Sequence, residues 1–197
     1  MMRIVFLGDS LTDGYHLDRT KAYPALVLDR IRARGGEARV VNAGVSGDTT
    51  AQGLARLDPL LRERVDILVI ALGVNDLFQG VPVPVVGDHF EDIIRRTRAP
   101  WPEMRLVIAG MDLGPAFWSP SLSAEVQSMY EELARIHEAA LIPSLLAGVV
   151  GEAGMTLPDG VHPTAEGQQV IARTVWAALE PVVEEVDDAQ GKDQGAD

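Results

Sequence analysis

Cysteine is absent from the sequence of 197 residues. Its absence excludes disulfide bonds, catalytic thiolates and zinc sites built on thiolate ligands. It leaves the cellular compartment open. Any covalent chemistry in this chain must therefore use a nucleophile other than sulfur.

Positive charge is also scarce. The 17 lysine and arginine residues are outnumbered by 29 aspartate and glutamate residues, which gives a net charge of -12. Nucleic acids and anionic membranes both select proteins with basic patches, so we expect neither of them to be the main partner.

Long apolar runs are missing as well. No run approaches the ~20 residues that a membrane-spanning helix needs. The amino terminus has one basic side chain and a short apolar run that stops at Gly8, which is too short for a signal peptide. We expect a cytoplasmic protein, or a periplasmic one if a leader has been removed, with no stable membrane anchor. The oligomeric state stays open.

Short apolar runs rich in valine and isoleucine are what the chain does contain. They cover residues 3–8, 38–44, 66–73 and 105–110, each ending in glycine, with a weaker run at 140–146. Runs that do not alternate with polar residues are typical of parallel strands buried on both faces. Helical patterns lie between them, the most regular one with Ser123 as its N-cap. This alternation predicts an α/β fold with helices on both faces of a parallel sheet.

The length and the spacing of these elements predict a single domain over residues 1–186. Residues 187–197 are acidic and rich in glycine and glutamine, a composition that predicts a disordered tail.

Polar residues follow the strands at the points where the strands end. Ligands of an open parallel sheet bind beyond the carboxyl ends of its strands, so these residues are expected to converge on one edge. They are Asp9, Ser10, Asn42, Gly44, Ser46, Gly47, Asp48, Asn75, Asp76 and Asp112, joined by Asp159 and His162 before the last helix.

This set contains every part that acyl transfer requires. Ser10 can be the nucleophile, His162 the base that takes its proton, and Asp159 the group that orients the imidazole. The N–H groups of Ser10 and Gly47 and the side-chain amide of Asn75 can stabilise an oxyanion. Leu113, Phe117 and Asp76 are candidates for substrate binding.

Four short motifs carry a resemblance to a known family. The segments GDSLTDG, NAGVSGDTT, GVND and DGVHP, in this order, resemble the four sequence blocks of the GDSL, or SGNH, hydrolases. They look closest to the bacterial acyl-CoA thioesterase I, arylesterase and lysophospholipase branch. The resemblance implies a three-layer α/β/α sandwich with a flavodoxin-like sheet of strand order 2-1-3-4-5, and no metal or cofactor.

The resemblance also implies roles for individual residues. Ser10 matches the nucleophile, Gly47 and Asn75 match the oxyanion donors, and Asp159 and His162 complete the triad. The implied activity is a serine esterase or thioesterase that hydrolyses short- to medium-chain acyl esters, small molecules, through an acyl-enzyme. A carbohydrate acetyl esterase of the same family is the alternative substrate class.

Several residues also allow simpler interpretations. Ser10 could merely cap a helix, Asn75 could be a turn residue, and Gly44 competes with Gly47 as the oxyanion donor. Phe117 could pack its own loop instead of lining a pocket. His89 falls early in a helical pattern, where we expect a solvated side chain.

Other function classes fit less well. The nucleotide-binding patterns G-x-G-x-x-G and G-x-x-x-x-G-K-[ST] are both absent. An aspartyl-phosphate phosphatase needs D-x-D, but Leu11 follows Ser10 where the second aspartate would stand. A non-catalytic binding module leaves the D-x-x-H block unexplained. A magnesium-dependent hydrolase could draw its ligands from Asp9, Asp76, Asp159 and His162, although one histidine among carboxylates would be a thin set for zinc.

Overall fold

A five-stranded parallel sheet forms the middle layer of the protein in a computed structural model, which describes residues 1–194. Its strand order is β2-β1-β3-β4-β5, as predicted. The strands are β1 (Met2–Gly8), β2 (Ala38–Gly44), β3 (Ile67–Ala71), β4 (Arg105–Ala109) and β5 (Ala140–Ile142).

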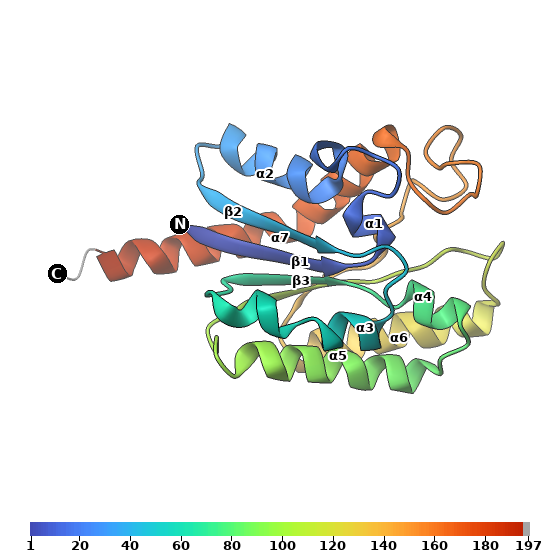
Figure 1. Ribbon diagram of the computed structural model, residues 1–197, viewed down its shortest axis with the longest axis horizontal. Helices are drawn as coiled ribbons and strands as arrows, with labels where there is room; N and C mark the ends of the chain where they lie inside the picture. Colours follow the sequence, from blue (N-terminus) through green and yellow to red (C-terminus); the bar gives the residue numbers. More distant parts are fainter. Residues whose placement is uncertain (195–197) are drawn as a thin grey trace.

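Helices cover both faces of the sheet and complete the three layers (Figure 1). One face carries α1 (Ser10–Asp13), α2 (Tyr23–Ala33) and α7 (Ala165–Gln194). The other carries α3 (Thr50–Ala55), α4 (Val74–Phe78), α5 (Val83–Arg98) and α6 (Pro120–Ile136). Two short 3-10 helices lie at Arg19–Lys21 and Asp58–Arg62. None of the helices within the described part of the chain combines the length and the apolar character needed to cross a bilayer.

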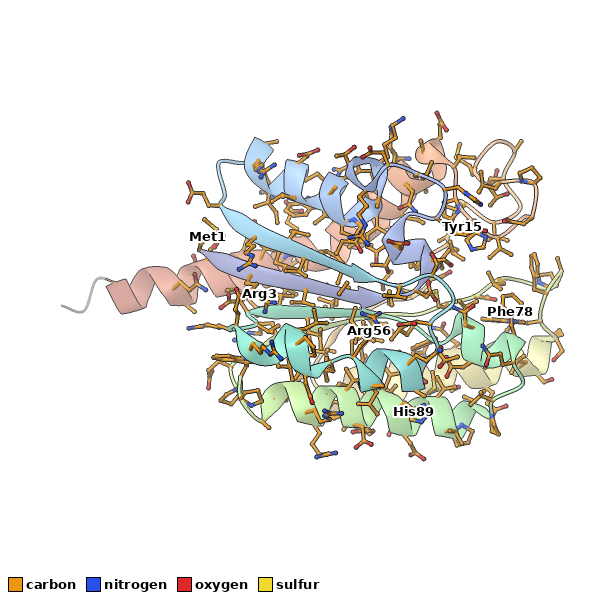
Figure 2. All side chains as sticks on the ribbon, in the orientation of Figure 1. Met1, Arg3, Tyr15, Arg56, Phe78 and His89 are labelled. Atoms are coloured by element: carbon orange, nitrogen blue, oxygen red, sulfur yellow. The ribbon has the colours of Figure 1, made fainter. Side chains whose placement is uncertain are left out.

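Strand burial explains why the apolar runs form this sheet. Every residue of β1 and β3 is buried, which fits central strands covered by helices on both faces. The register pairs Gly8 with Gly44 on one side and with Ala71 on the other. Three strands therefore end at the same edge. Tyr15 and Phe78 lie at this end of the molecule, and Met1 and Arg3 lie at the opposite end (Figure 2).

Some boundaries differ from the sequence predictions. Helix α6 begins at Pro120, and its N-cap is Ser119, whose hydroxyl accepts a hydrogen bond from the Leu122 N–H at 3.2 Å, so the prediction of Ser123 as the cap is wrong. Strand β5 stops at Ile142 because Pro143 follows, and proline has no N–H for a strand ladder.

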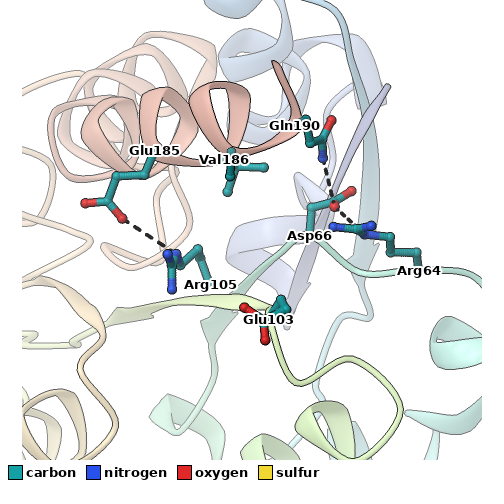
Figure 3. A pocket seen from close by; sticks show the side chains of 8 residues that line it. Arg64, Asp66, Glu103, Arg105, Glu185, Val186 and Gln190 are labelled. Atoms are coloured by element: carbon teal, nitrogen blue, oxygen red, sulfur yellow. Dashed lines mark hydrogen bonds and ion pairs between the residues drawn. The ribbon is translucent and has the colours of Figure 1, made fainter. Parts of the chain in front are cut away.

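Residues 187–194 belong to helix α7, whereas their composition predicts disorder; residues 195–197 lie outside the described part. Two contacts hold this end of α7 against the amino-terminal ends of the strands, around a small polar pocket (Figure 3). Gln190 donates to Asp66 Oδ1 at 3.0 Å, and Glu185 lies 3.6 Å from Arg105. Asp66 is itself buried and accepts the Arg3 N–H at 2.7 Å. These tertiary contacts favour a helix at the end of the chain, and they outweigh the local composition, which favours disorder.

Asp9 stands between β1 and α1 and is completely buried. Its Oδ1 accepts the Leu11 N–H at 2.9 Å and thereby caps α1, while its Oδ2 has no hydrogen-bond partner among residues 1–194. Burial raises the pKa of Asp9 to about 7, and the nearby charges of Asp48 and Asp76 add to this effect, against the Leu11 hydrogen bond that lowers it. The folded protein therefore favours the neutral carboxyl.

This burial makes the stability depend on pH. Between the ordinary Asp9 pKa of 3.8 and its raised pKa of about 7, the unfolded chain ionises Asp9 while the folded chain keeps it protonated. The unfolded state then binds fewer protons, so the Asp9 contribution to the free energy of unfolding falls as the pH rises through this window.

We predict that Asp9→Asn removes this penalty, because asparagine keeps the capping oxygen and cannot ionise. Between pH 5 and pH 8 the free energy of unfolding of the variant should rise relative to wild type by about 2–3 kcal/mol. Urea unfolding of both proteins at the two pH values measures this change. A difference between the proteins that is the same at both pH values would contradict the assignment.

Candidate active site

Ser10 is the first residue of α1, directly after the capping residue Asp9. Since Asp9 supplies the cap, the Ser10 hydroxyl is not needed to begin the helix. The turn before it is tight: a Cβ on Gly8 would lie 2.0 Å from Thr12 Oγ1, a position that only glycine allows. Thr12 in turn shares a hydrogen bond of 2.8 Å with the Tyr23 hydroxyl. The turn thus holds Ser10 at the carboxyl end of β1.

His162 and Asp159 come from the loop before α7, and the fold brings His162 to Ser10 across 152 residues of sequence. His162 Nε2 lies 3.0 Å from Ser10 Oγ, and His162 Nδ1 lies 2.8 Å from Asp159 Oδ2. Asp159 Oδ1 accepts the N–H groups of Val161 and His162, both at 2.9 Å. The loop therefore fixes the carboxylate and the ring in one orientation.

The charge state of Asp159 suits this arrangement. Partial burial alone would raise the pKa of the Asp159 carboxyl, but the two backbone N–H groups and the His162 ring outweigh it. The net result is a pKa below the ordinary value of 3.8. The ionised carboxylate can stabilise a positive charge on His162.

The Tyr15 ring packs against the His162 ring, although Tyr15 is not among the site residues predicted from the sequence. The two ring centroids are 4.2 Å apart, with an angle of 32° between the planes. Gly14, with φ of 85°, ends α1 and turns the chain so that Tyr15 reaches the loop of His162. His16, the neighbour of Tyr15, contacts Tyr15 itself, with ring centroids 4.0 Å apart. No sequence pattern signals such a stack between distant segments.

Two further segments follow β2 and β3, the strands that flank β1. In the loop between β2 and α3, Gly47 has φ of 88°, and its N–H makes no hydrogen bond within the described chain. The Gly44 N–H instead donates to Asn42 Oδ1 at 2.9 Å, so it is occupied. Asn75, on α4, donates one amide hydrogen to the Asp48 carbonyl at 2.9 Å, which leaves its second amide hydrogen for another acceptor.

The three candidate substrate-binding residues have different surroundings. Asp76 and Leu113 are each only 1% exposed. Asp76 uses both oxygens on Thr50, and Leu113 packs in the hydrophobic core. Only Phe117 has substantial exposed surface, at 39%. It lies edge-on to Phe78, a residue that the sequence analysis missed, with ring centroids 6.4 Å apart.

The donor set considered for a metal does not form one cluster. Asp159 is held by His162 and its own loop, whereas Asp76 is held by Thr50. Over residues 1–194, no group of three or more histidine, aspartate or glutamate residues is arranged to hold a metal ion.

Comparisons with known proteins identify the family of this chain. The family model of the GDSL-like Lipase/Acylhydrolase family matches residues 6–170. Esterase TesA of Pseudomonas aeruginosa is 34% identical over 181 residues, which cover 91% of this chain and 89% of that protein. Thioesterase 1/protease 1/lysophospholipase L1 of Escherichia coli is 31% identical over 181 residues, which cover 91% of this chain and 84% of that protein.

A solved structure extends the likeness to three dimensions. A crystal structure of TesA superimposes with a TM-score of 0.87 at 33% identity, over 92% of this chain and 99% of that one. Family match, sequence identity and fold therefore agree over nearly the whole chain. The chain belongs to the GDSL-like lipase/acylhydrolase family, and it is a hydrolase of ester bonds.

Proposed function

We propose that the protein hydrolyses short- to medium-chain acyl esters and thioesters through a Ser10–His162–Asp159 triad and an acyl-enzyme. The observation that carries this proposal is the continuous line of contacts from Ser10 Oγ to His162 Nε2 at 3.0 Å, and from His162 Nδ1 to Asp159 Oδ2 at 2.8 Å. A nucleophile, a base and an orienting carboxylate in this order are the parts of a serine hydrolase.

The reaction proceeds in two halves. His162 Nε2 accepts the Ser10 proton while Oγ bonds to the acyl carbon, and the carbonyl oxygen becomes an oxyanion. His162 then gives the proton to the departing alcohol or thiol as its bond to the acyl carbon breaks. In the second half, His162 removes a proton from water, which attacks the acyl carbon. The bond between Ser10 Oγ and the acyl carbon then breaks, the acid leaves, and His162 returns the proton to Oγ.

The oxyanion is stabilised by the Ser10 N–H, the Gly47 N–H and the free amide hydrogen of Asn75. The first residue of a helix has no intrahelical acceptor for its N–H, and the Gly47 N–H is also unoccupied in the described chain. Because Asn75 is held by the Asp48 carbonyl, its amide is fixed before the substrate arrives. Fixed donors stabilise developing charge without a cost of reorganisation.

Apolar surface beside the triad loop favours an acyl chain as the bound group. Phe78 is 52% exposed and Phe117 39%, and a Cβ on Gly160, within the triad loop, would lie 3.8 Å from the Phe117 ring. The relatives named esterase and thioesterase support both oxygen and sulfur esters as substrates.

We predict that Ser10→Ala lowers hydrolysis of an aryl butyrate and of a short acyl-CoA by several orders of magnitude, because no other group replaces the nucleophile. The variant should fold normally, since the cap of α1 belongs to Asp9. Steady-state kinetics and circular dichroism measure the two properties. A folded variant that keeps wild-type activity would exclude Ser10 as the nucleophile.

Asn75→Ala should reduce kcat by roughly 10²–10³-fold with a much smaller effect on KM, because an oxyanion donor acts mainly in the transition state. The same aryl butyrate assay measures both constants, and thermal melting checks that the loop of Asp48 is still ordered. An unchanged kcat in the folded variant would assign the donor role to other groups.

A further inference from the structure

A chain of three polar side chains connects α5 to the two segments that carry the proposed oxyanion donors. His89 lies on α5 (Figure 2). Its Nδ1 is 2.8 Å from Thr50 Oγ1, on the first residue of α3. Thr50 Oγ1 lies 2.6 Å from Asp76 Oδ1, and the Thr50 N–H donates to Asp76 Oδ2 at 2.8 Å. Thr50 and Asp76 are 0% and 1% exposed. His89 is half-buried, so the expectation of a solvated side chain is wrong.

The direction of these hydrogen bonds follows from the atoms available. A separation of 2.6 Å is typical of a hydroxyl that donates to an ionised carboxylate. The Thr50 hydroxyl has a single hydrogen, so once this hydrogen points at Asp76 the oxygen can only accept from His89. His89 must therefore carry its hydrogen on Nδ1 and donate it to Thr50.

The chain ends on the two segments that carry the proposed oxyanion donors. Asp76 directly follows Asn75 on α4, and Thr50 begins α3, directly after the loop that contains Gly47. The Asn75 amide also donates to the Asp48 carbonyl in this loop. Asp76 thus fastens α4 to the start of α3 through both of its oxygens, and His89 holds the hydroxyl that binds one of them.

We propose that His89 is a positioning residue for ester hydrolysis, acting through Thr50 and Asp76 on the alignment of the Gly47 and Asn75 donors. This inference rests on the proposed function, because it assumes that these two groups stabilise the oxyanion. Without the His89 donor, a buried lone pair on Thr50 loses its partner, and the hydroxyl is free to rotate away from Asp76. The donors then shift relative to Ser10, and such small displacements lower the rate of the chemical step.

Three substitutions test the donor specifically. Asparagine at 89 places an amide N–H at the position of Nδ1, glutamine places it near Nε2, and leucine has no donor. We expect His89→Leu and His89→Gln to lower kcat for an aryl butyrate by about tenfold with KM changed less than twofold. His89→Asn should recover most of the wild-type kcat.

A wild-type kcat in the folded His89→Leu variant would overturn the proposal. It would also be overturned if His89→Asn were no better than His89→Gln, since both variants are polar and only the donor position differs. If His89→Leu does not fold, the comparison of His89→Asn with His89→Gln still decides whether the position of the N–H donor affects kcat.

Thr50→Val supplies an independent check because it removes the hydroxyl and keeps the branched shape. If His89 acts through this hydroxyl, Thr50→Val combined with His89→Leu should lower kcat no further than Thr50→Val alone. Multiplied losses would show that His89 acts by another route and would contradict the proposal.

A matched control comes from His137, a second histidine that contacts α5. Its Nε2 lies 2.7 Å from Glu91, and it does not contact Thr50 or Asp76 in the described structure. His137→Leu should lower the melting temperature and leave kcat unchanged; an equal fall in kcat would make the His89 effect a general consequence of loosening α5.

Ser10→Ala in the same assay separates this inference from the proposed function. If it stays active the proposed function fails, whereas an inactive Ser10→Ala beside a fully active His89→Leu rejects this inference alone.

Discussion

The close approach of β2 to the turn after β1 is the constraint on which the site depends. A Cβ on Gly44 would lie 2.2 Å from the Asp13 backbone nitrogen, so the end of β2 packs directly on the backbone of α1. Asn42 joins the same two segments by donating to the Thr12 carbonyl at 2.8 Å. Because Ser10 and the loop of Gly47 extend from these segments, this contact sets their relative positions. Sheet register and backbone packing, more than side-chain contacts, bring the motif of Ser10 and the motif of Gly47 together.

Three buried carboxyl groups lie in the segments that follow β1, β2 and β3. Asp9, Asp48 and Asp76 are each less than a tenth exposed. Arg56 pairs with Asp48 and also donates to the Gly8 carbonyl at 2.9 Å, and Asp76 is satisfied by Thr50. Over residues 1–194 no cation pairs with Asp9, and its burial favours the protonated form, as its pKa of about 7 reflects. The site therefore combines Asp48 and Asp76, whose contacts hold its loops, with Asp9, whose ionisation lowers the free energy of unfolding at high pH.

The sequence predicted the strands and the α/β class because the signals for them are local, whereas the strand order was implied by the family resemblance. The strand at residues 3–8 and its partners could be identified from apolar runs, and the four motifs identified the residues that meet at the sheet edge. The stack of Tyr15 on His162, the His89 contact and the docking of Gln190 could not be predicted, since each joins segments far apart in the chain. Leu113 and Asp76 were named from their place after strands, and their burial depends on packing that no local pattern encodes.

Covalent trapping of the nucleophile tests the assignment of Ser10 without relying on substitutions. An aryl phosphonate ester mimics the tetrahedral intermediate and should phosphonylate one residue, Ser10, with release of the aryl alcohol. Intact-protein and peptide mass spectrometry, read against loss of esterase activity, should show one adduct on Ser10 that rises in step with inactivation. Inactivation with the adduct on another residue, or a Ser10 adduct that leaves hydrolysis intact, would contradict the assignment of Ser10 as the nucleophile.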